Sequence, residues 1–313
     1  MPLDPFLAER MPLIANLTYE DAASDPEVWS KFAAAFLDDR PYERPEVGVR
    51  DADVLGDYPC RVRVYTPTAG HRTDRPALVW AHGGGFTEGT LDDHEADTVA
   101  REVCVTGDVV VVSVDYPLAN GSTVRYPILH RSLMAAFTWT LSNAVELGVD
   151  AEQIALGGAS AGGNLTVAAT MELRDTGRVA PARLVLVYPG MSSAHVTNEE
   201  HELLMADIPP LFRLEQDVVA GIWATYAADA PDTTYLSFEH MPSLGELPPI
   251  LLVLSEYDDL RVSAEEIFDR PEQADLEVER YLARGVTHGH LSMAPVVPET
   301  RATLDRVAEF VKP

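Results

Sequence analysis

The chain has 313 residues, and its 50 acidic residues outnumber 23 lysines and arginines, which gives a formal net charge of −27 at pH 7. This charge argues against a nucleic-acid partner and against an anionic membrane surface, because both repel acidic proteins. The length accommodates one large α/β domain with insertions or two small domains. The two cysteines, Cys60 and Cys104, are far apart and make no disulfide framework.

The chain shows no pattern of a secreted or membrane-spanning protein. Residues 1–10 carry acids and prolines and lack the apolar stretch of a signal peptide. The longest apolar runs, 109–112 and 250–254, are too short to cross a bilayer. We therefore expect a soluble cytoplasmic protein with no membrane partner.

Short apolar runs alternate with helical patterns along most of the chain. In chain order these are strand 61–65, strand 77–81, helix 92–104, strand 109–114, helix 130–147 ended by Gly148, strand 153–156, helix 164–173, strand 184–188, strands 250–254 and 276–280, and helix 301–311. Such alternation predicts a mostly parallel sheet with helices on both faces. Ligands bind these sheets at the carboxyl ends of the strands, so residues that follow strands are the first candidates for a site.

Two segments depart from this alternation. Residues 1–45 are helix-like and amphipathic but are broken by prolines, and residues 191–231 are irregular, helical and rich in aromatic side chains. We expect both segments to form a cap over the strand ends. The remaining residues, 46–190 and 232–313, then form the α/β core.

A serine lies at a predicted strand-to-helix turn. Gly158-Ala159-Ser160-Ala161-Gly162 follows an apolar strand and precedes a helix of small residues. A strand, a sharp turn with serine at its apex and a helix make up a nucleophile elbow. Glycines flank the serine because a Cβ there would clash with the neighbouring strand or helix. By itself the pentapeptide is also compatible with an ordinary strand-to-helix turn.

A serine hydroxyl needs a positioned base to attack at neutral pH. His288 lies in the loop after the last strand, where the base falls in the chain order serine, acid, histidine. His290 is the near rival. The other seven histidines lie in the glycine loop, in a polar loop, on predicted helices, or in or near the inserted segment: His71, His82, His94, His130, His195, His201 and His240.

The acid that orients this histidine should follow the strand 250–254. Glu256, Asp258 and Asp259 offer three carboxylates there, and spacing alone does not choose between the two aspartates. For the carboxylates that do not orient the histidine, we expect Asp259 to cap the following helix and Glu256 to be a structural partner.

The oxyanion of a tetrahedral intermediate needs preorganised N–H donors. Ala161, which follows the serine, and the run Gly83-Gly84-Gly85, which follows a strand, offer such amides. A phosphate-binding loop is the usual alternative for a glycine run. No Gly-Lys-Ser/Thr follows, however, and residues 83–89 do not keep the spacing of a dinucleotide fingerprint.

Together these motifs resemble those of the hormone-sensitive-lipase-like (HGGG) α/β-hydrolases, in their bacterial carboxylesterase branch, over about residues 46–313. The motifs are His82-Gly83-Gly84-Gly85-Phe86, Val114-Asp115-Tyr116 with Leu118-Ala119, Gly158 to Asn164, Asp258 to Arg261, and His288-Gly289. The resemblance implies the α/β-hydrolase fold, with an eight-stranded, mostly parallel sheet and a helical cap. It also implies that Asp258 is the acid, that Gly84, Gly85 and Ala161 supply the oxyanion amides, and that His82 shapes the glycine loop.

The activity that the resemblance implies is hydrolysis of small carboxylic esters by Ser160, His288 and Asp258, without a metal or cofactor. We expect short acyl chains, because three bulky aromatic residues are expected near the site: Phe86, Trp223 and Tyr226. An amide, lactam, carbamate or lactone substrate stays open, as does a homodimer. A non-catalytic ligand-binding protein is disfavoured because all three triad residues are present.

The chain departs from the family pattern at three places. Ala159 stands where an acid or threonine is usual, residues 116–121 lack a structural arginine and glutamate, and His290 replaces a phenylalanine. None of these changes removes a catalytic group. We expect them to affect the hydrogen bonds around the site, the rate and the substrate preference.

Overall fold

The computed structural model describes residues 2–37, 42–68, 70, 72–231 and 233–313. Residues 38–41 of the expected N-terminal cap segment, together with His71 and Asp232, lie outside the described residues. Among the described residues, no helix is long and apolar enough to cross a bilayer.

One eight-stranded sheet runs through the molecule in the order β1-β2-β4-β3-β5-β6-β7-β8. Its strands are β1 (Gly48–Val54), β2 (Cys60–Thr66), β3 (Arg75–Ala81), β4 (Val110–Asp115), β5 (Val149–Ala159), β6 (Leu184–Val187), β7 (Ile250–Tyr257) and β8 (Val278–Thr287). Strand β2 pairs antiparallel with β1 and with β4, and every other neighbouring pair is parallel. The predicted mostly parallel sheet is therefore confirmed.

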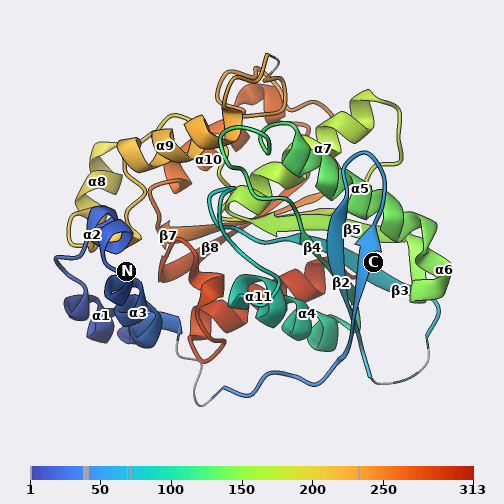
Figure 1. Cartoon of the computed structure of the whole chain (residues 1–313), viewed down its shortest axis with the longest axis horizontal. Coiled ribbons are helices and arrows are strands. Elements are labelled where there is room, and N and C mark those ends of the chain that lie inside the picture. The colour runs from blue at the N-terminus through green and yellow to red at the C-terminus, as the bar shows by residue number, and fades with distance from the viewer. Residues whose placement is uncertain (1, 38–41, 69, 71, 232) are drawn as a thin grey trace.

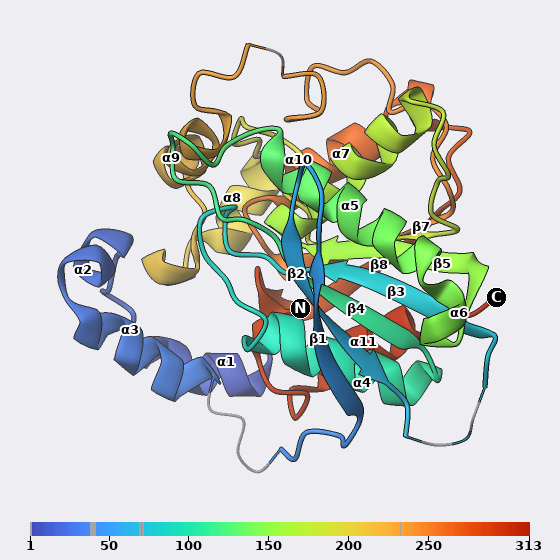
Figure 2. The same cartoon turned by 45° about the vertical axis from the view of Figure 1, so that its right-hand side comes forward.

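Helices cover both faces of this sheet (Figures 1 and 2). The helices of the described residues are α1 (Pro5–Arg10), α2 (Tyr19–Ser24), α3 (Pro26–Phe32), α4 (Val99–Gly107), α5 (Ile128–Ser142), α6 (Ala144–Leu147), α7 (Ala161–Asp175), α8 (Glu199–Met205), α9 (Gln216–Ala227), α10 (Arg261–Phe268) and α11 (Pro298–Phe310), with short 3₁₀ or π helices η1 (Met11–Leu13), η2 (Ala33–Leu37), η3 (His94–Thr98), η4 (Pro210–Phe212), η5 (Pro271–Gln273) and η6 (His290–Ser292). Helices α4 and α11 pack on one face, and α5, α7 and α10 pack on the other.

Successive side chains of the buried strands point to opposite faces of the sheet and pack into two apolar cores. In β3 every residue is buried; Val79 belongs to the core under α5 and α7, whereas Leu78 and Trp80 belong to the core under α4 and α11. This two-residue period follows from strand geometry. It explains why the central strands read as continuous apolar runs in the sequence.

The N-terminal helices and the inserted segment pack against each other beside the sheet (Figure 1). The ring of Phe212 lies 5.2 Å from the ring of Phe32 and 4.9 Å from the ring of Phe36, measured between centroids. Aromatic pairs at such distances stabilise a contact beyond the area they bury. Two segments that are far apart in the sequence thus pack together into one aromatic cluster.

Several elements differ from the sequence prediction. Strand β1 was not predicted, because its mostly exposed and charged residues give no apolar run. The helix expected over 130–147 is two helices, α5 and α6, which are separated at Asn143 by a non-helical backbone conformation. The strand expected over 276–280 runs instead from Val278 to Thr287, since the charges of this edge strand hide its pattern.

Candidate active site

Ser160 occupies a sharp turn between β5 and α7. Its backbone φ of 53° is uncommon for a residue with a side chain, and its amide donates to the carbonyl of Val187 on the neighbouring strand. A Cβ at Gly158 would collide with the backbone of Gly162, and a Cβ at Gly162 would collide with the carbonyl of Ala81. Both glycines are therefore required for the close packing that holds the serine at the end of the strand.

Three side chains from separate loops form one hydrogen-bonded chain. His288 Nε2 lies 2.9 Å from Ser160 Oγ, and His288 Nδ1 lies 2.8 Å from Asp258 Oδ2. An ionised carboxylate only accepts hydrogen bonds, so Nδ1 carries the proton and Nε2 is free to accept from the serine hydroxyl. The structure thus brings together all three residues predicted for the triad.

The charges around His288 favour its protonated form. Burial by itself lowers the pKa of the imidazole, but the adjacent Asp258, by its charge and its hydrogen bond, raises it, and Glu95 and Asp259 add to this effect. The net result is a pKa above the usual histidine value. This arrangement stabilises an imidazolium next to the serine.

The two neighbouring aspartates have different partners. Asp258, which is 1% exposed, accepts from His288 and, through Oδ1, from the amide of Leu260 at 2.9 Å. Asp259 accepts from the guanidinium of Arg213 and from the amide of Leu214 at 2.7 Å. The helix cap expected of Asp259 is wrong, because Arg213 in the inserted segment draws its carboxylate away from α10, which has no side-chain cap.

Two further sequence predictions near the site can be compared with the structure. Glu256 accepts from the amide of Gly285 at 2.7 Å, so its expected structural role is confirmed. His290, the rival base, is buried between Ser255 Oγ at 3.0 Å and Thr303 Oγ1 at 2.9 Å. Burial, together with the charge of His288, lowers the pKa of His290 to about 3, so His290 stays a neutral structural side chain.

The glycine loop lies beside the serine. Gly84 and Gly85 have φ of 102° and 55°, which glycine adopts at little steric cost. Their amides donate to no described residue, and both glycines line one cavity with Ser160 and Ala161. His82 is buried, stacks on Tyr116, and lies with Nδ1 2.8 Å from the carbonyl of Gly83.

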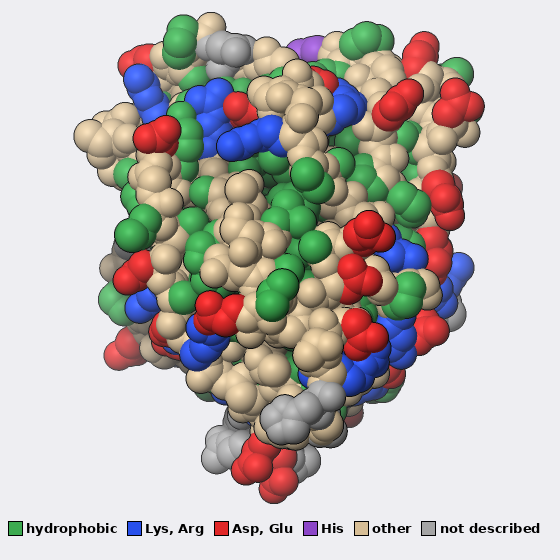
Figure 3. Space-filling model, turned by 90° about the vertical axis from the view of Figure 1, so that its right-hand side faces the viewer, with side chains coloured by type: hydrophobic (Ala, Val, Ile, Leu, Met, Phe, Trp, Pro, Cys, Tyr) green, Lys and Arg blue, Asp and Glu red, His purple; other side chains and the backbone are tan. Residues whose placement is uncertain are grey.

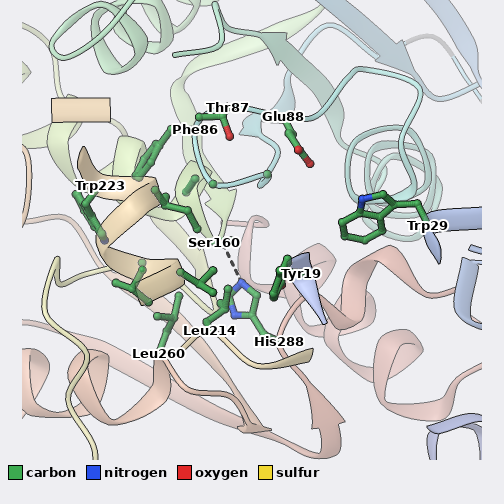
Figure 4. A pocket seen from close by; sticks show the side chains of 17 residues that line it. Tyr19, Trp29, Phe86, Thr87, Glu88, Ser160, Leu214, Trp223, Leu260 and His288 are labelled. Carbon is green, nitrogen blue, oxygen red and sulfur yellow. Dashed lines mark hydrogen bonds between the residues drawn. The ribbon is translucent and has the colours of Figure 1, made fainter. Parts of the chain in front are cut away.

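The cavity next to Ser160 has a volume of about 350 Å³ and a mostly apolar lining (Figure 4). Phe86 and Trp223 line it, as predicted. Tyr226 does not line it, which corrects the sequence prediction: its ring is fully buried behind Phe86, with the ring centroids 4.1 Å apart. Helix α9 presents Trp223 to the cavity and Tyr226 to the core.

A smaller cavity of about 190 Å³ adjoins the first. Four residues line both cavities: Tyr19, Trp29, Leu214 and His288. The rest of the smaller cavity is lined largely by aromatic and apolar side chains of the N-terminal and inserted segments: Phe32, Phe36, Leu37, Leu211 and Phe212. Figure 4 shows Tyr19 next to His288, with Trp29 farther from the serine.

Sequence reasoning missed several residues of this site. Tyr19, Trp29 and Leu214 lie outside any motif, and only the general expectation of a cap pointed to their segments. Glu95 was also missed: it is one of many acids in a helical stretch, yet it is buried beside the glycine loop. Only its three-dimensional contacts distinguish it from a solvent-exposed acid.

Comparison with known proteins agrees with this geometry. Residues 78–292 match the model of a family described as having the alpha/beta hydrolase fold. The carboxylesterase NlhH of Mycobacterium tuberculosis is 34% identical over 81% of this chain and 79% of its own length. Ethyl acetate hydrolase of Pseudomonas putida is 29% identical over 80% of this chain and 77% of its own length.

Solved structures give the same result. The hyperthermophilic esterase from the archaeon Pyrobaculum calidifontis superposes with a TM-score of 0.82 and 30% identity, covering 100% of this chain and 98% of its own. The residues that match the family model include part of strand β3, strands β4 to β8 and the turn that holds Ser160. The chain therefore belongs to the α/β-hydrolase-fold family, in the hormone-sensitive-lipase-like branch that its motifs resemble.

Proposed function

We propose that this chain hydrolyses short-chain carboxylic esters with Ser160 as nucleophile, His288 as base and Asp258 as the acid that orients it. Ester hydrolysis is the activity named for its relatives. The observation that carries the assignment of residues is the unbroken hydrogen-bonded chain from Asp258 through His288 to Ser160 at the wall of an apolar cavity.

In the first half-reaction, Ser160 Oγ attacks the ester carbonyl carbon while His288 Nε2 takes the hydroxyl proton. The amides of Gly84, Gly85 and Ala161 donate to the resulting oxyanion. His288 then returns the proton to the leaving alkoxide, and the acyl group stays on the serine. In the second half-reaction, His288 takes a proton from water, which attacks the acyl carbon. The bond from that carbon to Ser160 Oγ then breaks, His288 returns the proton to Ser160 Oγ, and the carboxylic acid is released.

The sizes of the cavities support small substrates. The acyl group has to lie near Ser160 and the glycine loop, which line the cavity of about 350 Å³. The cavity of about 190 Å³ is also lined by His288, which returns the proton to the leaving group. An apolar cavity of about 150 Å³ already accommodates a benzene ring, so the smaller cavity has room for the alcohol of a small ester.

The N-terminal and inserted segments act as the cap in this proposal. Residues 1–45 and 191–231 would cover the core formed by 46–190 and 232–313. The support is that Tyr19 and Trp29 of the first segment, and Leu214, Ile222 and Trp223 of the second, line the cavity next to the serine.

The test compares wild type with Ser160→Ala. Wild type is expected to react with a fluorophosphonate probe and to turn over p-nitrophenyl acetate and butyrate, and Ser160→Ala to do neither. A folded wild-type protein that neither reacts nor turns over would contradict the proposed mechanism. A series of p-nitrophenyl esters tests the acyl preference separately, because an optimum at long chains would contradict it.

A further inference from the structure

Glu95 is a buried carboxylate that neither the triad nor the glycine loop accounts for. It lies in η3 and is 8% exposed. Its Oε2 accepts from the amide of Gly83 at 2.5 Å, and its Oε1 accepts from the hydroxyl of Tyr188 at 2.6 Å. Burying a carboxylate costs free energy unless it has hydrogen-bond partners. These two hydrogen bonds therefore hold Glu95 in place, and each one links it to a different loop of the site.

The first contact holds the glycine loop. A Cβ on Gly83 would collide with Glu95 Oε2 and would lie 3.1 Å from Ser160 Cβ. The carboxylate therefore occupies the space that a side chain at position 83 would take. It fixes the peptide between His82 and Gly83, one residue before Gly84 and Gly85, the proposed oxyanion donors.

The second contact reaches the histidine loop. Tyr188 follows β6, and its ring lies against the ring of His288, with centroids 4.9 Å apart. The Tyr188 hydroxyl oxygen also accepts from the amide of Leu291, three residues beyond His288. The backbone φ of Tyr188 is 36°, which is uncommon for a residue with a side chain. Tyr188 is thus held in a strained conformation between Glu95 and His288.

The charge of Glu95 is not neutralised locally. Its two hydrogen-bond donors are an amide and a phenol, and it forms no ion pair with any arginine or lysine in the described part of the chain. Ionisable side chains face His288 and its surroundings from several elements: Asp258 and Asp259 after β7, Glu95 in η3, Tyr188 after β6, His290 in the same loop, Tyr19 in α2, and Glu88 after the glycine loop. Among these, the carboxylate of Asp259 is already paired with Arg213.

We propose that Glu95 is a positioning residue, which ties the glycine loop to the histidine loop through Tyr188 and whose negative charge stabilises the imidazolium that forms when His288 takes the serine proton. This inference rests on the proposed function of Ser160 and His288. Asp258 orients His288 by direct contact, whereas Glu95 acts through Tyr188 and through its field. Electrostatic preorganisation of this kind lowers the barrier without movement at the moment of reaction.

The decisive variant is Glu95→Gln, which keeps the size of the side chain and an acceptor for the Gly83 amide but removes the charge. We expect kcat on p-nitrophenyl acetate to fall on the order of tenfold, with little change in KM. We also expect the acidic limb of the kcat/KM profile to move to lower pH. The reason is that loss of a nearby negative charge lowers the pKa of His288.

The matched variant is Tyr188→Phe, which removes the link but keeps the carboxylate. We expect a lower kcat with the acidic limb at its wild-type position. A wild-type kcat and an unmoved limb in Glu95→Gln would overturn the proposal. If Glu95→Gln does not fold, Tyr188→Phe decides, because wild-type turnover in that variant also overturns it. Turnover by Ser160→Ala, measured in parallel, would instead overturn the proposed function itself.

Discussion

Adjacent identical side chains do different work in this molecule. Asp258 and Asp259 are both carboxylates at the end of β7, and both are almost fully buried. Backbone direction turns one toward His288 and the other toward Arg213. The role of each aspartate is therefore determined by the side chain that it contacts. Spacing in the sequence does not reveal that contact.

Replacing each aspartate by asparagine is expected to separate the two roles. In Asp258→Asn the amide can donate to His288 and favour the wrong tautomer, so kcat should fall on the order of 10³-fold to 10⁴-fold with the fold intact. In Asp259→Asn the loss should appear in the free energy of unfolding, by about 3 kcal/mol, because Arg213 loses its buried partner. Steady-state kinetics and denaturant unfolding of both variants check this, and the reverse pattern would contradict it.

The raised pKa of His288 predicts the pH dependence of the wild-type enzyme. The base is active only when neutral, so kcat/KM should fall as pH decreases through the pKa of His288. Because Asp258 and the other nearby charges outweigh burial and raise this pKa, the fall should begin at a higher pH than the usual histidine value predicts. A pH profile of p-nitrophenyl acetate hydrolysis measures it, and a midpoint below the usual value would contradict it.

At the scale of elements, the N-terminal segment contributes Tyr19 to the lining of both cavities. Tyr19 is the first residue of α2, and Thr18 caps this helix by accepting a hydrogen bond from the amide of Asp21. The ring of Tyr19 lines both cavities beside His288. Burial, together with the charges of Glu88 and Asp259, raises the pKa of the Tyr19 hydroxyl to about 12. The phenol that lines both cavities is therefore neutral at pH 7.

Removing this ring is expected to change which esters are accepted. In Tyr19→Ala the two cavities should join, and the ratio of kcat/KM for the p-nitrophenyl hexanoate and butyrate esters should rise about tenfold, since two more methylenes find apolar surface. Tyr19→Phe, which keeps the ring, is the control and should stay within about twofold of the wild-type ratio. An unchanged ratio in Tyr19→Ala would show that the ring does not limit acyl length.

How much of these elements the sequence predicts depends on where the signal lies. Strands buried on both faces, such as β3 and β4, are continuous apolar runs and were predicted within two residues. Strand β1 was missed because its exposed charged residues contribute nothing to the core. The apolar periodicity predicts one continuous helix over 130–147, whereas the structure has two helices that are separated at Asn143. For the site, chain order and motifs predicted Ser160 and His288. Glu95 has no such signal, because its role depends on contacts across the fold.

At the scale of the whole molecule, the excess of acidic residues is the dominant property. Figure 3 shows that on the face it presents, acidic side chains are interspersed with arginines or lysines and are not gathered into one patch. Self-repulsion spread over the surface opposes the compact state. The net charge of −27 is therefore a cost to stability that depends on solvent.

Added salt is accordingly expected to stabilise the protein. The Debye length falls from about 30 Å at 0.01 M to about 3 Å at 1 M ionic strength, so the midpoint of thermal unfolding at pH 7 should rise with sodium chloride. The matched control is the same titration near pH 4.5, the isoelectric point, where the salt effect should be much smaller. A midpoint that falls with salt at pH 7 would show that attractive ion pairs outweigh the repulsion.

The order of the strands also affects how the enzyme loses activity. Ser160 follows β5, a central strand, whereas His288 follows β8, which pairs only with β7 at the edge of the sheet. Edge elements open with a smaller free energy than the interior of a domain. A brief detachment of β8 would thus separate base from nucleophile while most of the fold persists. In mild denaturant, inactivation should precede the loss of circular dichroism, so that turnover reports on local opening before any global measure of folding does.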